Sequence, residues 1–128
     1  MTNIFDEEEI DVVSEYGLGV VLERANQKAA KATQNYIDTE LNGQDNMPCG
    51  FAWVDFLSYN GVKITGNTKI GRLMKKSGLK QNHYKRFSVW CPGRVMCQNV
   101  DALKAGADAF AEVLKENGFH VVASSRLD

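Results

Sequence analysis

Apolar residues recur along residues 18–41 at alternating steps of four and three, and this periodicity constrains the fold more than any other feature. The positions are Leu18, Leu22, Ala25, Ala29, Ala32 and Tyr36. Side chains at these steps share one side of a helix, so the pattern predicts a long amphipathic helix. Its central positions are alanine, so the element packed there must approach closely. An element of the same chain is the expected partner, and a helix of another subunit is the alternative.

The rest of the chain alternates between short strands and helices. Aromatic and β-branched residues predict strands at 51–57, 62–64, 86–91 and 119–123. Cap residues predict a helix that begins after Asn67 or Thr68 and ends at Gly78, and another from Asn99 to Asn117. The sequence therefore predicts one α/β (α+β) domain, with about three helices packed on a small mixed or antiparallel sheet of three to four strands.

An acidic segment precedes the long helix. Asp6 and Glu9 have the spacing of a capping box, and no Lys or Arg occurs before Gly17. Gly17 and Gly19 are predicted to break or kink the chain. This divides the protein into an acidic N-terminal helical segment, 1–17, and a single α/β domain, 18–128.

The net charge of −1 conceals a one-sided distribution. Residues 56–100 contain no acidic side chain but nine basic ones: Lys63, Lys69, Arg72, Lys75, Lys76, Lys80, Lys85, Arg86 and Arg94. A block of one sign indicates an anionic partner more strongly than the total charge does. A solvated helix face is the alternative explanation for part of this charge.

Strand 86–91 and the loop before it carry the strongest candidate site. Alternation places Phe87, Val89 and Cys91 toward the core and Arg86, Ser88 and Trp90 on the other side. Cations donate hydrogen bonds to phosphate, and aromatic rings stack on bases, so this mixture suits a nucleotide. The predicted anion- or nucleotide-binding residues are Arg86, Trp90, Lys85, Tyr84, Arg94 and Arg126. Arg126 belongs to the site only if the tail 124–128, expected to be mobile, folds back over it.

No motif predicts a catalytic residue, a metal or a cofactor. Residues 61–71 resemble a phosphate loop, but Asn67 stands where that motif requires lysine. The candidate zinc ligands or Cys–His partners, Cys49, His83, Cys91, Cys97 and His120, lack metal-site spacing. Asp55 is expected to form a structural ion pair with one of the basic groups. The sequence leaves enzymatic activity open and favours a protein that is not an enzyme.

Bulk properties predict a protein of the cytoplasm. The first residues lack the basic and apolar regions of a signal peptide, and no apolar run is long enough to cross a membrane. The three cysteines are odd in number and suit free thiols in a reducing compartment. The alanine-rich helix face and the opposed charge blocks also favour a homo-oligomer.

Four runs of sequence together resemble small uncharacterised accessory proteins of tailed bacteriophages: CGFAWV (49–54), VWCP (89–92), QNVDALKAGADAFAEVL (98–114) and the final SRLD. The resemblance covers roughly the C-terminal two-thirds of the chain and assigns no activity. It implies a phage accessory protein that acts in the bacterial host cytoplasm and counters host defence, either by blocking a host protein or by sequestering a nucleotide signal.

Three functions follow, in order of preference. The first is sequestration of a phosphate-bearing small molecule, such as a nucleotide immune signal. The second is a protein-interaction module that inhibits a host protein through the acidic segment or the basic face. The third is nucleic-acid binding, disfavoured because the acidic segment would repel a polyanion.

Overall fold

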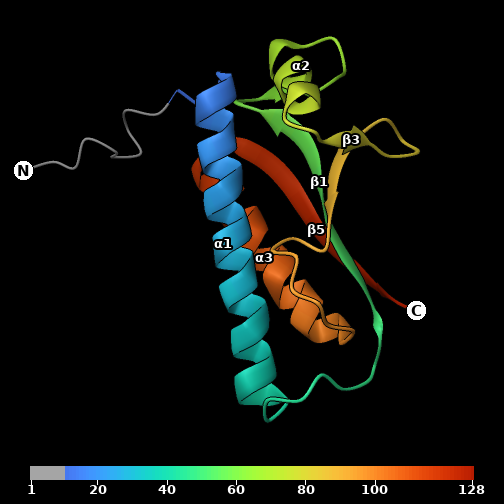
Figure 1. Cartoon of the computed structure of the whole chain (residues 1–128). Helices are drawn as coiled ribbons and strands as arrows, with labels where there is room; N and C mark the ends of the chain where they lie inside the picture. The colour runs from blue at the N-terminus through green and yellow to red at the C-terminus, as the bar shows by residue number, and fades with distance from the viewer. Residues whose placement is uncertain (1–10) are drawn as a thin grey trace, which may run out of the picture.

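The computed structural model describes residues 11–128, and it has the predicted α+β architecture (Figure 1). The elements, in chain order, are α1 (Glu15–Glu40), β1 (Gly50–Tyr59), β2 (Val62–Lys63), α2 (Lys69–Lys76), β3 (Lys80–Gln81), β4 (Phe87–Trp90), α3 (Val100–Glu116) and β5 (Phe119–Leu127). All strand pairs are antiparallel, and the sheet has five strands, one of which, β3, was not predicted.

Strand β1 is the centre of the sheet. Along one edge it pairs with nearly the whole of β5, from Gly50 opposite Leu127 to Tyr59 opposite Phe119. Its other edge is shared, because β4 pairs with residues 53–56 and the short β2 pairs with residues 58–59. Strand β3 lies outside β4. The last strand along the described chain therefore pairs with the central strand and forms one edge of the sheet.

The hydrophobic core lies on the helix side of this sheet. Alternation in β1 buries Ala52, Val54 and Phe56 and leaves the residues between them partly exposed. Helix α3 packs its buried Leu103 and Phe110 into the same cluster, and Phe110 meets Phe56 edge-on. Figure 1 shows α1 beside α3, with β5 crossing behind both. The order from front to back is thus helices, core, sheet.

The alanine-rich face of α1 packs within the chain, against α3. Ala25 and Ala29 are fully buried, and Thr33 is 1% exposed. A Cβ atom at Gly106 of α3 would lie only 2.2 Å from the hydroxyl oxygen of Thr33, so the two helices approach as closely as glycine allows. This face is therefore not free to contact another subunit. The prediction of a homo-oligomer must rest on a different surface.

The predicted break at Gly17 and Gly19 is wrong, because both residues lie inside α1. Ser14 caps the helix by accepting a hydrogen bond from the Gly17 N–H at 3.0 Å. A Cβ atom at Gly17 would meet the Asp11 carbonyl oxygen at 1.8 Å, so this glycine is required by close packing of the preceding turn. The Asp6–Glu9 capping box lies outside the described residues. The predicted boundary between 17 and 18 falls within α1.

The expected polar tail, residues 124–128, is also corrected: β5 continues to Leu127 and pairs with β1. The Asp128 N–H then donates to the Cys49 carbonyl at 3.1 Å. Within residues 11–128, no helix is long and apolar enough to cross a lipid bilayer.

Candidate functional site

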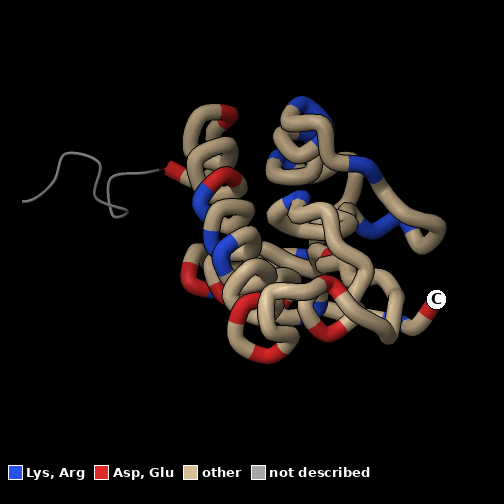
Figure 2. Tube along the Cα trace, turned by 60° about the horizontal axis from the view of Figure 1, so that its bottom comes forward, with Lys and Arg blue, Asp and Glu red and all other residues tan. Residues whose placement is uncertain are grey.

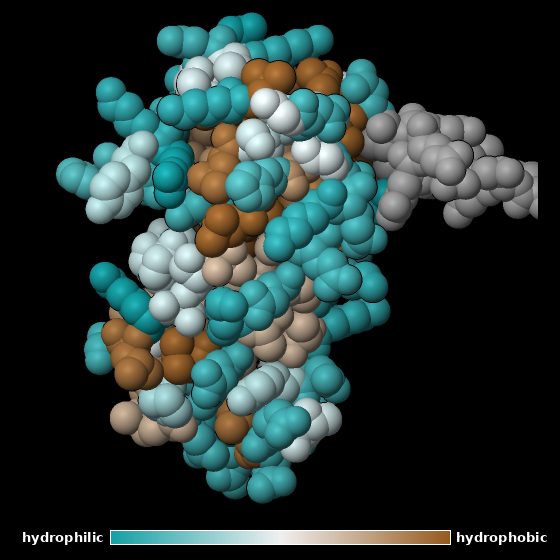
Figure 3. All heavy atoms as spheres, turned by 180° about the vertical axis from the view of Figure 1, so that it is seen from behind, coloured by the Kyte–Doolittle hydropathy of each residue, from teal (hydrophilic) through white to brown (hydrophobic). Residues whose placement is uncertain are grey.

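The face of the sheet opposite the helices is open. Strand register places Phe51, Trp53 and Asp55 of β1 on this face, with Ser88 and Trp90 of β4 beside them. Figure 3 views the molecule from behind, where the sheet lies nearer the viewer than the helices, and hydrophobic residues reach the surface among hydrophilic ones. The predicted outward side of β4 is therefore part of a larger surface built by several strands.

Aromatic rings occupy one end of the open face. Trp53 and Trp90 are directly paired across β1 and β4, and their rings stack with centroids 4.9 Å apart and planes 20° from parallel. Phe51 meets Trp90 edge-on at 6.0 Å. The Arg126 guanidinium carbon lies 5.8 Å from the Phe51 ring centroid, because β5 places Arg126 opposite Phe51. Phe51, Trp53, Trp90 and Arg126 are called the aromatic surface below.

The aromatic surface is available to a ligand. Trp90 is 50% exposed although it stacks on a second indole, and its free ring area is the kind on which a base stacks. Arg126, predicted as a conditional member, is held here by the strand pairing of β5. Sequence reasoning missed Phe51 and Trp53 as site residues. Their alternation along β1 was readable, but the register that sets Trp53 against Trp90 was not.

A basic groove of about 1060 Å³ lies toward the other end of the open face. Its cationic and titratable basic lining residues are Lys63, Lys75, Lys85, Arg86 and His120, and none of its lining residues, all within residues 11–128, is acidic. Tyr84, which is 76% exposed, also lines it. Figure 2 shows the Lys and Arg positions gathered along α2 and the β3–β4 hairpin. The fold thus brings Lys63 and Lys75 to the predicted Tyr84, Lys85 and Arg86.

Asn82 organises the hairpin loop that carries three of the predicted site residues. Its side-chain oxygen accepts hydrogen bonds from the N–H groups of Tyr84 (2.9 Å) and Arg86 (3.1 Å). Its carbonyl accepts from the Lys85 N–H at 2.9 Å, and Lys85 takes a left-handed conformation with φ of 62°. In an Asx-turn the side chain of Asn accepts a hydrogen bond from the N–H two residues later, as Asn82 does from Tyr84. An Asn within a short loop between two strands is a known signal of this turn, so Asn82 could have been identified from the sequence.

Asp55 lies on the open face, but its side chain bonds to an amide rather than to a cation. Its Oδ1 accepts a hydrogen bond from the Asn82 Nδ2 at 3.2 Å. The predicted ion pair with a basic residue is therefore replaced by this contact. Asp55 links β1 to the hairpin loop, and in doing so it connects the strand that carries Trp53 to the loop that carries Lys85.

The aromatic surface and the basic groove are separated by a fixed length of strand. Arg86 directly precedes β4 and is four residues from Trp90, so alternation places it on the same side at about 13 Å along an extended chain. The predicted pair therefore shares one face without converging on one point. A single ligand that touches both must be at least as long as this separation.

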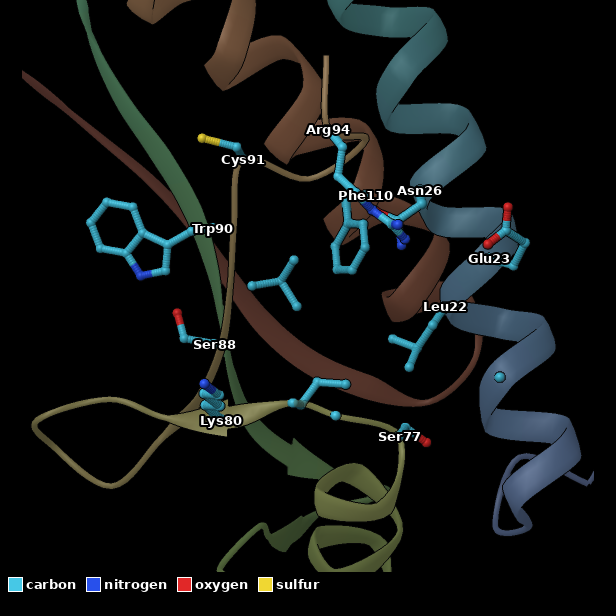
Figure 4. Close-up of a pocket in the computed structure, with 14 residues that line it drawn as sticks. Leu22, Glu23, Asn26, Ser77, Lys80, Ser88, Trp90, Cys91, Arg94 and Phe110 are labelled. Atoms are coloured by element: carbon cyan, nitrogen blue, oxygen red, sulfur yellow. The ribbon is translucent and has the colours of Figure 1, made fainter. Parts of the chain in front are cut away.

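Of the other predicted site residues, only Trp90 shares a cavity with Arg94. This second cavity, of about 530 Å³, lies between α1 and β4 and is also lined by Leu22, Asn26 and Phe110. Figure 4 shows Arg94 and Trp90 pointing to opposite sides of β4. The turn after β4 is fixed by the Gly93 N–H, which donates to the Asn26 Oδ1 at 3.0 Å, and this turn directs the chain toward α1. Arg94 therefore lies apart from the basic groove, and its part in the candidate site stays a prediction.

The cysteines and histidines do not form a metal centre: among residues 11–128 no group of three or more His, Cys, Asp or Glu could hold an ion. All three cysteines are free thiols. Burial, followed by the charges of Asp45 and Cys91, raises the pKa of the Cys97 thiol to about 11. Cys97 therefore stays protonated at neutral pH and is a poor nucleophile.

The glycines of residues 61–71 serve turns and close packing. Gly61 follows Asn60 in the β1–β2 hairpin, and both have positive φ. A Cβ atom at Gly71 would meet the Thr65 carbonyl oxygen at 1.8 Å. Gly66 lies against Lys75, whose Nζ would be 2.8 Å from an added Cβ atom. This segment is not a phosphate loop, but six of its residues line the basic groove: Gly61, Lys63, Ile64, Thr65, Gly66 and Asn67.

Comparison with known proteins yields no relative: no family model, no curated protein and no solved structure matches this chain.

Proposed function

We propose that this protein binds a phosphate-bearing small molecule of the nucleotide class on the open face of its sheet and sequesters it. The observation that carries the proposal is the basic groove, whose charged lining residues are all cationic. Phosphate oxygens accept charge-assisted hydrogen bonds from Lys and Arg, and among residues 11–128 no acidic side chain lines the groove to compete for these donors.

The aromatic surface supports the nucleotide class in particular. The exposed ring of Trp90 offers a stacking partner for a base, and its contact with Trp53 keeps it in one orientation. Because Arg86 lies about 13 Å from Trp90 along β4, the proposed ligand is extended, with its phosphates well separated from a base. A molecule with a phosphate chain or with two linked nucleosides meets this requirement.

The biological setting comes from the resemblance to phage accessory proteins. A phage protein that retains a nucleotide signal would act in the bacterial cytoplasm, where it would lower the free concentration of the signal and so counter host defence. Binding alone is sufficient for this role. Binding requires cationic hydrogen-bond donors for the phosphates and an aromatic ring for the base, and the open face supplies both.

A thermal-shift panel of mononucleotides, dinucleotides, cyclic dinucleotides and dinucleotide cofactors tests the proposal. A ligand present at a hundred times its Kd stabilises the folded state by about 2.7 kcal/mol, which raises the Tm by several degrees in a domain of this size. Extended ligands should stabilise more than mononucleotides at equal concentration. The absence of any shift across the panel would contradict the proposal.

Single-stranded nucleic acid is a second candidate, favoured by one observation: stacked aromatic side chains lie on an uncovered strand face beside cationic groups. Affinity for oligonucleotides that increases with length and falls steeply with salt would favour this candidate. Saturation by one small nucleotide, with a shallow salt dependence, would favour sequestration.

A further inference from the structure

Strand β5 has an open edge that runs along its whole length. It pairs with β1 on one side, and within residues 11–128 no strand pairs with its other side. The remaining outer strands, β2 and β3, are only two residues long. A long unpaired edge is a template for adding another strand, and proteins that leave one exposed use it or protect it.

The backbone groups on this edge can be identified from the hydrogen bond between the Asp128 N–H and the Cys49 carbonyl. Asp128 thus directs its N–H toward β1, and because direction alternates along a strand, the residues two apart from it do the same. The residues between them, Val121, Ala123, Ser125 and Leu127, therefore direct their N–H and C=O groups outward. Half of the backbone of β5 is available to a partner.

The side chains of β5 are those of a strand suited to pairing at its open edge. Val122 is 41% exposed and Leu127 is 65% exposed, although both are apolar. The strand contains no proline and no lysine, the residues that commonly protect an edge. His120 and Asp128, near its two ends, are exposed side chains that can carry opposite charges.

We propose that two copies of the chain pair through β5 in antiparallel orientation, about a two-fold axis at Ser124, and join their sheets into one. In this register Ala123 lies opposite the partner's Ser125, and Val121 lies opposite the partner's Leu127. These are the outward-directed residues, so each pair exchanges two backbone hydrogen bonds. The exposed Leu127 side chain lies at the edge beside the partner's Val121, which is itself buried in the partner's core, and Val122 packs beside the stem of the partner's Arg126.

Charge selects this register among the neighbouring ones. With Ser124 on the axis, His120 lies directly opposite the partner's Asp128, and the two-fold axis repeats the attraction. A register centred on Ala123 would place Arg126 opposite the partner's His120, so that two basic side chains would meet. The dimer also extends the open face, since the aromatic surfaces of both copies then belong to a single sheet.

Disulfide crosslinking tests the register. Ser124→Cys places two thiols on the axis in a non-hydrogen-bonded pair, where Cα atoms are about 4.5 Å apart and a disulfide can form. The matched control is Ser125→Cys, because residue 125 and its copy are diagonal neighbours about 7–8 Å apart and on the other side of the sheet. Under mild oxidation, Ser124→Cys should form a covalent dimer, whereas Ser125→Cys and the parent chain, with its three thiols, should not. Equal crosslinking of both variants would overturn the proposal.

Sedimentation equilibrium tests the interface itself. Ala123→Pro removes an outward N–H and places a ring on the edge, while the hydrogen bonds to β1 remain. It should raise the Kd of the dimer at least tenfold, with an unchanged far-UV circular dichroism spectrum. His120→Glu should also weaken the dimer, and adding Asp128→Lys should restore it.

If Ala123→Pro fails to fold, the charge-reversal pair His120→Glu and Asp128→Lys still tests the interface, because both side chains are exposed and their substitution should leave the fold intact. A chain that remains monomeric at all concentrations overturns the proposal. So does a dimer that neither Ala123→Pro nor His120→Glu weakens, since such a dimer would use another surface.

Discussion

The indole rings of Trp53 and Trp90 stack across two neighbouring strands at a centroid distance of 4.9 Å, and they are the only two tryptophans in the chain. The relationship depends on strand register, which pairs residue 53 of β1 with residue 90 of β4. All tryptophan fluorescence of the protein therefore originates at the aromatic surface, so a ligand that stacks there can be observed without a label.

Trp90→Ala should weaken nucleotide binding by about 1–3 kcal/mol, the usual contribution of one base stacked on an aromatic side chain. The Tm should fall only slightly, because the ring is half exposed. Fluorescence quenching and calorimetry measure the nucleotide affinities of the parent chain and of Trp90→Ala. A Trp90→Ala variant that binds as tightly as the parent would show that the base does not contact this surface.

Lys75→Ala should weaken binding about tenfold or more, whereas Lys76→Ala should leave it within about twofold. The loss of one charge-assisted hydrogen bond to phosphate accounts for this magnitude. Lys75 lines the basic groove and Lys76, its neighbour in the last turn of α2, does not. Both variants lose the same favourable interaction with the helix dipole, so their stabilities should match. Equal losses of affinity would indicate general attraction by charge instead of a site.

Asn82→Ala should lower both the free energy of unfolding, by about 1–2 kcal/mol, and the affinity for the ligand. The reason is that the Asn82 amide supports Tyr84 and Arg86 through their backbone N–H groups. Asp55→Ala is the control: it removes the 3.2 Å contact with Asn82 but keeps the loop bonds, and it removes a negative charge near the groove. Affinity should not fall in Asp55→Ala. Urea unfolding and calorimetry compare the two.

Gly106→Ala should destabilise the fold by about 1–3 kcal/mol despite the better helix propensity of alanine, because the new methyl group overlaps the Thr33 hydroxyl. Thr33→Ala removes the overlapping oxygen and should recover most of the loss in the double variant. A double-mutant cycle by urea denaturation measures this coupling. Additive effects would mean that α1 and α3 do not approach as closely as described.

Cys97 should react with iodoacetamide about a hundredfold more slowly at pH 8 than an unperturbed thiol. Its pKa is raised from 9.0 to about 11, and only the thiolate reacts. Because burial and the negative charge of Asp45 both disfavour the thiolate, Asp45→Asn should speed the reaction. The rate, followed by mass spectrometry of the Cys97 peptide, should rise with pH throughout the range from 8 to 10.

Periodicity and caps were sufficient to predict most of the fold. The α1 helix was readable because its buried positions repeat at helical steps, and Thr68 and Asn99 cap the helices that they were expected to cap. The same local rules failed at Gly17, where glycine serves a close contact within a helix. They failed again at Ser124–Leu127, where pairing with β1 supplies the hydrogen bonds that a polar segment needs to become a strand.

The candidate site was only partly predictable, because it depends on which strands are neighbours. The outward side of β4 could be read from alternation, and so could the cations of the hairpin loop. Local sequence could not show that Trp53 meets Trp90, that Lys75 reaches the hairpin, or that the turn at Gly93 directs Arg94 toward a cavity beside α1. Those relationships are set by strand register and by turns that contact distant helices.

The pairing of β1 with β5 also determines when the protein can fold during its synthesis. Gly50 and Leu127 are neighbours in the sheet although 77 positions separate them, by 127 − 50. Until the ribosome has released β5, one edge of the central strand has no partner and Arg126 is missing from the face that it completes. Contacts of such long range slow folding and expose intermediates to aggregation. Nascent chains that end before Phe119 should therefore depend on chaperones, and the ability to bind a ligand should be acquired only after β5 has left the ribosome.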